Sequence, residues 1–190
     1  LTAMVMRLRQ LFRDDSLPFL NVQLPMWIAA GDEDKHDWAR LRLAQARAAS
    51  ALQPGGLAIL LDCGEFDNIH PTDKRTPGER LCDVALRVVY GMDAPESPRA
   101  LGKYTHGDTL VVTLSAPVLR RETGELLLEI AGEDGAYHPV QSVTLAGAEM
   151  RLRSVAVLHP AKVRYAYVNW GTVALFGRYG LPLAPFAFEG

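Results

Sequence analysis

The sequence lacks long apolar runs, has few cysteines and carries no excess of basic residues. Its apolar stretches are interrupted well before the roughly 18 residues of a membrane span, so no span is predicted. Cys63 and Cys82 are too few for a disulfide framework, and their apolar surroundings predict buried free thiols rather than nucleophiles. A formal net charge of -2 with scattered Lys and Arg excludes the basic footprint that is typical of nucleic-acid binding.

The start of the chain has neither an initiator Met nor a basic-then-apolar signal pattern, so we expect it to begin inside a longer protein. Its 190 residues are 48% hydrophobic and 22% charged, which is typical of an ordinary globular chain. This length is enough for one domain or two small ones.

The first half alternates strand and helix patterns. Apolar spacing predicts a helix over 4–12, a buried strand over 18–24, a helix over 37–52 and a second strand over 57–62. A further helix is predicted from residue 76. Strands and helices in this order indicate an α/β layer with a parallel sheet.

The periodicity of the 37–52 segment assigns its two faces. Trp38 and Leu41 belong to the predicted core face. Arg40, Arg42 and Arg47 fall largely on the opposite face, where we expect them to be exposed to solvent.

A short polar turn, Glu65 to Pro71, connects the second strand to the next helix, and Thr76 as N-cap with Glu79 is expected to open that helix with a capping box. In this turn Asp67 precedes His70 by three residues. A carboxylate placed there can orient the imidazole through one ring nitrogen, which leaves the other nitrogen to take a proton from a nucleophile. Asp67 can instead simply cap the turn by accepting backbone N–H groups.

The nucleophile of such a triad is not evident within the chain. A serine nucleophile typically follows a strand in a glycine-flanked turn. None of the serines has that context: they are Ser16, Ser50, Ser97, Ser115, Ser142 and Ser154.

The second half follows a linker over 93–98 and changes to a period of two. We therefore expect a small antiparallel sandwich or partial barrel over 99–190. The aromatic and proline-rich stretch 176–188 is predicted to pack without regular structure. The predicted strands cover 109–115, 124–131, 142–145, 149–154 and 161–169, with turns at Gly107-Asp108, Asp134-Gly135 and Gly147-Ala148.

The chain contains, in this order, the segments Leu17-Pro18-Phe19-Leu20-Asn21-Val22-Gln23-Leu24, Trp38 to Gln45, Glu65-Phe66-Asp67-Asn68-Ile69-His70-Pro71 with Lys74, Ile130 to Gly135, Val163 to Ala166 and Gly180 to Phe186. In order and spacing these segments resemble the carboxyl half of sialate O-acetylesterases.

The resemblance implies a serine esterase of the SGNH hydrolase type that removes O-acetyl groups from sialic acid or related sugars. Residues 1–92 would be the carboxyl half of its flavodoxin-like parallel-sheet domain, and 99–190 a small antiparallel β-sandwich-like domain. His70 matches the base and Asp67 the acid. Many members carry Asn followed by Asp where this chain has Asp67 and Asn68, so Glu65 is the alternative carboxylate.

The resemblance also implies that the serine and the oxyanion donors precede Leu1. An upstream segment or a second chain would then complete the sheet and supply the serine. The resemblance further implies a secreted, periplasmic or lysosomal location and no cofactor.

Two residues outside the His70 turn, Trp27 and His36, are further candidates for a site. Trp27 follows the first strand and is a candidate to stack on a sugar, although a Trp beside a sheet is more often part of the core. His36 lies among acidic residues, but the spacing is not that of a zinc site, so we expect no metal. The alternative to an esterase is a noncatalytic carbohydrate-binding or structural module.

Overall fold

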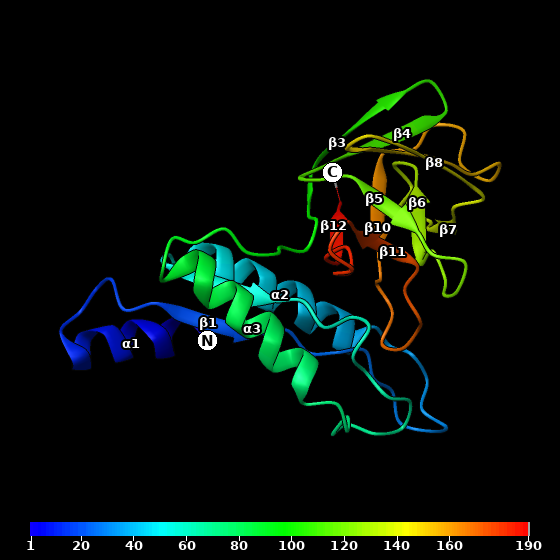
Figure 1. The fold of residues 1–190 in the computed structure, drawn as a ribbon. Helices are drawn as coiled ribbons and strands as arrows, with labels where there is room; N and C mark the ends of the chain where they lie inside the picture. The colour runs from blue at the N-terminus through cyan, green and yellow to red at the C-terminus, as the bar shows by residue number, and fades with distance from the viewer. Residues whose placement is uncertain (190) are drawn as a thin grey trace.

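The structure is a computed structural model that describes residues 1–189. Helices and one pair of strands come first along the chain, and strands alone follow (Figure 1). None of the described helices is long and apolar enough to cross a membrane. The elements are α1 (Thr2–Phe12), β1 (Phe19–Val22), α2 (Asp37–Ala51), β2 (Gly55–Ala58), α3 (Arg75–Val88), β3 (Ala100–His106), β4 (Thr109–Leu114), β5 (Val118–Arg120), β6 (Leu128–Ala131), β7 (His138–Pro139), β8 (Ser142–Ala146), β9 (Glu149–Arg153), β10 (Lys162–Tyr165), β11 (Leu175–Gly177) and β12 (Phe186–Phe188).

In residues 1–92, which we call the α/β half, β1 and β2 pair in parallel and α2 connects them. Leu20 of β1 is opposite Gly56 of β2, and this face packs against α3. A Cβ on Gly56 would lie 2.3 Å from Cγ1 of Val84, so α3 can approach the strand this closely only at a glycine.

The opposite face of the same pair contacts α2. Gln23 extends the strand ladder just past β1, and its side-chain Nε2 donates to the carbonyl of Arg42 at 3.3 Å. The backbone N–H of Leu24 donates to Oε1 of Gln45 at 2.9 Å. Because successive strand residues point to opposite faces, α2 and α3 cover opposite faces of the β1–β2 pair.

The predicted N-cap of the third helix is wrong. Thr76 lies inside the first turn of α3, and the residue at the N-cap position, Lys74, makes no side-chain cap. Oδ1 of Asp73 accepts the N–H groups of Arg75 and Thr76 at 2.9 and 3.1 Å. Asp caps helices at least as well as Thr. Glu79, which was expected to complete a capping box, instead accepts a hydrogen bond from Nε of Arg75 at 2.6 Å.

Residues 99–189, which we call the β-rich half, form three antiparallel sheets with strand orders β3-β4-β9-β8, β12-β10-β6-β7 and β11-β5. The predicted turns at Gly107 and Gly147 are confirmed, and both glycines have positive φ, 62° and 58°. Such a φ costs an L-residue energy and costs glycine little.

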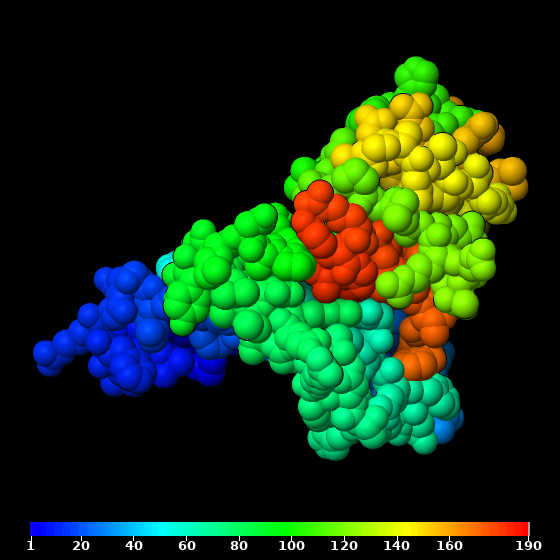
Figure 2. All heavy atoms as spheres, viewed as in Figure 1, coloured from blue at the N-terminus to red at the C-terminus, as the bar shows by residue number. Residues whose placement is uncertain are grey.

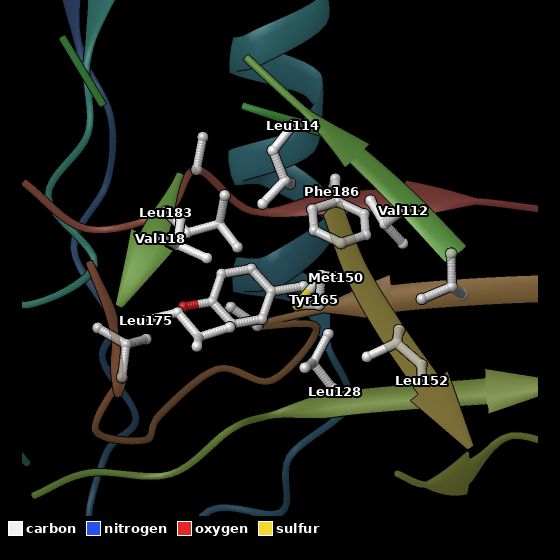
Figure 3. Close-up of a cluster of buried hydrophobic side chains, with 14 of the residues drawn as sticks. Val112, Leu114, Val118, Leu128, Met150, Leu152, Tyr165, Leu175, Leu183 and Phe186 are labelled. Atoms are coloured by element: carbon white, nitrogen blue, oxygen red, sulfur yellow. The ribbon is translucent and has the colours of Figure 1, made fainter. Parts of the chain in front are cut away.

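The sheets share one apolar core, shown in Figure 3. Tyr165 of β10 lies among side chains of β4, β6, β9 and β12 and is 0% exposed. The same cluster includes Met26, Ile59 and Leu61, so the α/β half and the β-rich half are packed against each other. The core residues labelled in Figure 3 are Val112, Leu114, Val118, Leu128, Met150, Leu152, Tyr165, Leu175, Leu183 and Phe186.

Two expectations about strands are corrected. Among the named strands of residues 1–189 only β1 and β2 pair in parallel, apart from an isolated parallel bridge between Glu125 and Val173, and β2 ends at Ala58 rather than Asp62. The stretch 176–188, predicted to lack regular structure, contains β12 and most of β11. These strands form because β5 and β10 supply partners from far along the chain, which local propensity does not report.

Candidate active site

The turn that carries His70 is closed by its own backbone. Glu65 and Asn68 form an isolated bridge, with the N–H of Asn68 donating to the carbonyl of Glu65 at 3.3 Å. Asp67 has a φ of 57°, a left-handed conformation that Asp tolerates better than most residues. Gly64 precedes the turn, and a Cβ there would lie 1.9 Å from the carbonyl oxygen of Met26, so glycine is required.

Arg80 of α3 fixes the segment that leads into this turn. Its Nη1 donates to the carbonyl of Ile59 at 2.7 Å and to Oδ1 of Asp62 at 2.6 Å. Its Nη2 donates to Oδ2 of Asp62 at 2.8 Å, which completes a bidentate ion pair. The pair holds the chain after β2 against α3.

Glu65 clamps the two ends of the turn. Oε1 accepts both the N–H and the hydroxyl of Thr72 at 2.6 Å, and Oε2 accepts Nδ2 of Asn68 at 2.6 Å. These bonds, that of the Thr72 hydroxyl first, lower the pKa of Glu65 below its ordinary value. Glu65 is therefore engaged in holding the turn.

Asp67 connects the turn to the loop that follows β1. Its Oδ1 accepts the N–H of Ala30 at 2.7 Å, and its own N–H donates to the carbonyl of Ile28 at 3.1 Å. The carboxylate thus accepts a backbone N–H, but from the loop after β1 rather than from its own turn, as the predicted turn cap would have required.

His70 is exposed on this turn, and its backbone N–H donates to Oδ1 of Asn68 at 3.1 Å. Among the histidines of residues 1–189, only His36 has a carboxylate oxygen within 4.0 Å of its ring, and that oxygen belongs to Asp34. The structure brings His70 and both candidate carboxylates into one turn without a direct ion pair between them. The pairing of His70 with Asp67 or with Glu65 stays a prediction.

Trp27 is half-buried and packs against Trp38, with ring centroids 5.3 Å apart. Its backbone N–H donates to the carbonyl of Asn169 at 2.8 Å, while its indole N–H is buried without a partner. A role for Trp27 in sugar binding stays a prediction.

Sequence reasoning missed the β10–β11 loop, residues 166–174, which had been assigned in part to a strand. Oδ1 of Asn169 accepts the N–H groups of Trp38 at 2.9 Å and Ala39 at 3.4 Å, so it caps the start of α2 from far along the chain. The N–H of Asn169 donates to Oδ2 of Asp34 at 2.7 Å. The local signal was weak: an Asn and a Gly two residues apart, at 169 and 171, are typical of a turn.

Arg42 of α2 bonds the same loop. It was predicted to lie on the solvent face of the helix, and this prediction is wrong. It is 0% exposed, and its Nη2 donates to the carbonyl of Ala166 at 3.1 Å and to that of Val168. Burial lowers the pKa of Arg42 to about 10, and the charge of Asp34 opposes this shift, so the side chain is still protonated at neutral pH. Leu41, predicted on the core face, is 47% exposed.

Cys63 does not have the character of a nucleophile. Burial, followed by the neighbouring Asp62 charge, raises the pKa of Cys63 to about 12, which disfavours the thiolate. Cys82 was predicted to be buried and is exposed on α3. Over the described part of the chain, no three His, Cys, Asp or Glu side chains are grouped so that they could hold a metal ion.

The chain is similar in structure to a carbohydrate esterase. No family model matches the sequence, and neither does any curated protein. One similar structure is the crystal structure of XAC1771, a carbohydrate acetylesterase from Xanthomonas citri, with a TM-score of 0.89 and 33% sequence identity. The match covers 98% of this chain and 44% of that protein, so this chain spans less than half the length of the esterase that it resembles.

Proposed function

We propose that this chain is part of a serine-type carbohydrate O-acetylesterase and contributes the catalytic base. The observation that carries the proposal is the likeness to a carbohydrate acetylesterase over 98% of the chain at 33% identity. The rigid turn that presents His70 at the surface is consistent with it, since a general base must reach a nucleophile and a substrate.

In the proposed reaction a serine Oγ from outside the 190 residues attacks the acetyl carbonyl, and His70 takes its proton. The tetrahedral intermediate expels the sugar oxygen, which receives that proton from His70. Water, deprotonated in turn by His70, then cleaves the acetyl-serine ester and releases acetate. Asp67, or alternatively Glu65, would hold the imidazolium in orientation by closing on its Nδ1–H.

We further propose that β1, α2, β2 and α3 are the late part of a flavodoxin-like sheet of the SGNH type, followed by a β-sandwich-like domain. Exposed apolar side chains on α1 support a covering segment upstream or in a second chain: Met4, Leu11 and Phe12 are 50%, 61% and 70% exposed. The substrate we propose is an O-acetylated sialic acid or related sugar, with Trp27 near the mouth of the site.

A noncatalytic carbohydrate-binding or structural module is the second candidate. One observation favours it: Asp67 and Glu65 both bond groups other than the His70 ring. An enzyme of this design would need one of them to change partner or to act through a water molecule.

Acetate release from acetylated sugars by the product of the complete reading frame separates the two candidates. An esterase releases acetate from O-acetyl sialic acid, and a serine-directed phosphonate both labels one serine and stops the reaction. A module that binds sugar without releasing acetate would overturn the proposal. The 190-residue chain alone is expected to show almost no turnover, because the loss of one triad member costs several orders of magnitude in rate.

A further inference from the structure

An aromatic contact joins the His70 turn to the β10–β11 loop. The rings of Phe66 and Trp170 meet edge to face, with centroids 5.7 Å apart and an interplanar angle of 63°. Phe66 remains 55% exposed despite this contact, and Trp170 is half-buried. In Figure 2 the orange loop lies directly against the blue-green surface to which this turn belongs.

Both rings are attached to backbone that is held in place. Phe66 lies between Glu65 and Asp67, whose carboxylates bond Thr72 and Ala30. Trp170 follows Asn169, which bonds the start of α2 and Asp34, in a loop that also receives the buried guanidinium of Arg42. A large apolar ring fixed at the surface loses little further entropy when a ligand covers it.

The chemistry of these rings fits a sugar. The C–H face of a pyranose ring is apolar and flat, whereas its hydroxyl or ester groups project from the rim, so an aromatic ring can cover the face and leave the rim free. Ile69, the residue before His70, adds a further apolar side chain to this turn and is 47% exposed.

We propose that Phe66 and Trp170 form a platform for the pyranose ring of the substrate, which places an acetyl group on the rim of that ring beside His70, four residues beyond Phe66. This inference rests on the proposed esterase function and adds the residues that would select a sugar ester over a simple ester. Since one platform residue comes from each half of the chain, the β-rich half would contribute directly to substrate selection.

The test compares a sugar ester with an ester that has no ring. Glucose pentaacetate and ethyl acetate are supplied to the product of the complete reading frame, and acetate release gives kcat and KM for each. Phe66→Ala and Trp170→Ala are expected to raise KM for glucose pentaacetate about tenfold, as the loss of one aromatic contact implies, with kcat and the ethyl acetate constants within about twofold. Phe66→Tyr keeps a ring and should restore KM, and Tyr90→Ala removes a ring that is 70% exposed elsewhere and should change neither substrate.

Equal losses on both esters would show that the two rings support the fold or are covered by another protein segment, and would overturn the platform. Unchanged constants in Phe66→Ala would overturn it as well. If neither ester is hydrolysed and O-acetyl sialic acid releases no acetate either, the esterase proposal fails by itself, and binding decides the platform. Titration of the His70→Ala protein with glucose pentaacetate should then quench tryptophan fluorescence in a saturable way that is lost in His70→Ala/Phe66→Ala; the same titration in both proteins would contradict the platform.

Discussion

The α/β half and the β-rich half of this chain are stabilised in different ways. In the β-rich half the three sheets share a core whose central side chains, such as Ile130 and Tyr165, are 0% exposed. In the α/β half only two strands pair within the described residues, and α1 (blue in Figure 1) leaves much of its apolar surface open. The candidate site lies in the α/β half, on loops that individual polar side chains hold in place.

This difference suggests a division of roles. Apolar burial stabilises the β-rich half, whereas Arg42, Asn169 and Arg80 set the geometry of the loops around His70. Substitutions in the apolar core should therefore lower stability, whereas substitutions in the exposed turn that carries His70 should mainly change activity.

The largest effect is expected from Asp67, the proposed acid of the site. Asp67→Asn keeps an oxygen that can accept the Ala30 N–H, so the fold should persist. In the complete enzyme kcat should fall by about 10³ or more, because the imidazolium loses its anion and its preferred tautomer. Glu65→Gln should be mild, and acetate-release kinetics of both variants would reveal the reverse assignment if Glu65→Gln proves the crippling change.

A core substitution should separate the halves by stability. Ile130→Ala removes a fully buried side chain from β6 and should lower the free energy of unfolding by about 2–5 kcal/mol. Leu20→Ala in β1 removes a partly buried side chain and should cost less. Urea unfolding of both variants measures the difference, and an equal cost would mean that the α/β half is packed as tightly as the β-rich half.

Two arginines of α2 make a matched pair. Arg42→Ala leaves the carbonyls of Ala166 and Val168 without their donor in a buried place and should lower stability by about 3 kcal/mol. Arg40, whose side chain is 59% exposed and paired with Asp37, should change stability by less than about 1 kcal/mol when replaced by Ala. Thermal unfolding of the two variants tests this; similar shifts would contradict the role assigned to Arg42.

The smallest expected effect is a local dependence on pH. The folded pKa of Glu65 lies below its ordinary value of 4.5, so its clamp on Thr72 is fully present above that value and is lost as pH falls through the lowered folded pKa. Amide exchange at Thr72 should therefore lose protection at acidic pH in the native chain and show no such transition in Glu65→Gln. Protection that is independent of pH in both proteins would show that Glu65 does not hold the turn.

Local patterns predicted the helices and several hairpins, but they could not predict long-range partners. The start of α2 is capped by Asn169 and the strands within 176–188 depend on β5 and β10, so neither feature has a signal near it in sequence. Arg42 was placed on the solvent face because periodicity weighs polarity, and it could not reveal the carbonyls that make burial of this charge tolerable. The spacing of Asp67 and His70 predicted a shared turn, but the Ala30 N–H that the Asp67 carboxylate accepts comes from a loop 37 residues away, which local spacing cannot reveal.

The central claim is that His70 is the base of an acetylesterase, and its most direct measurement is the rate of acetate release by His70→Ala in the product of the complete reading frame. His106, which is exposed in the β3–β4 hairpin, supplies the matched control as His106→Ala. We expect kcat on an acetylated sugar to fall by about 10³ or more in His70→Ala, with the unfolding midpoint unchanged, and to be unaltered in His106→Ala. A His70→Ala protein that is folded and releases acetate at the rate of the unsubstituted enzyme would contradict the account.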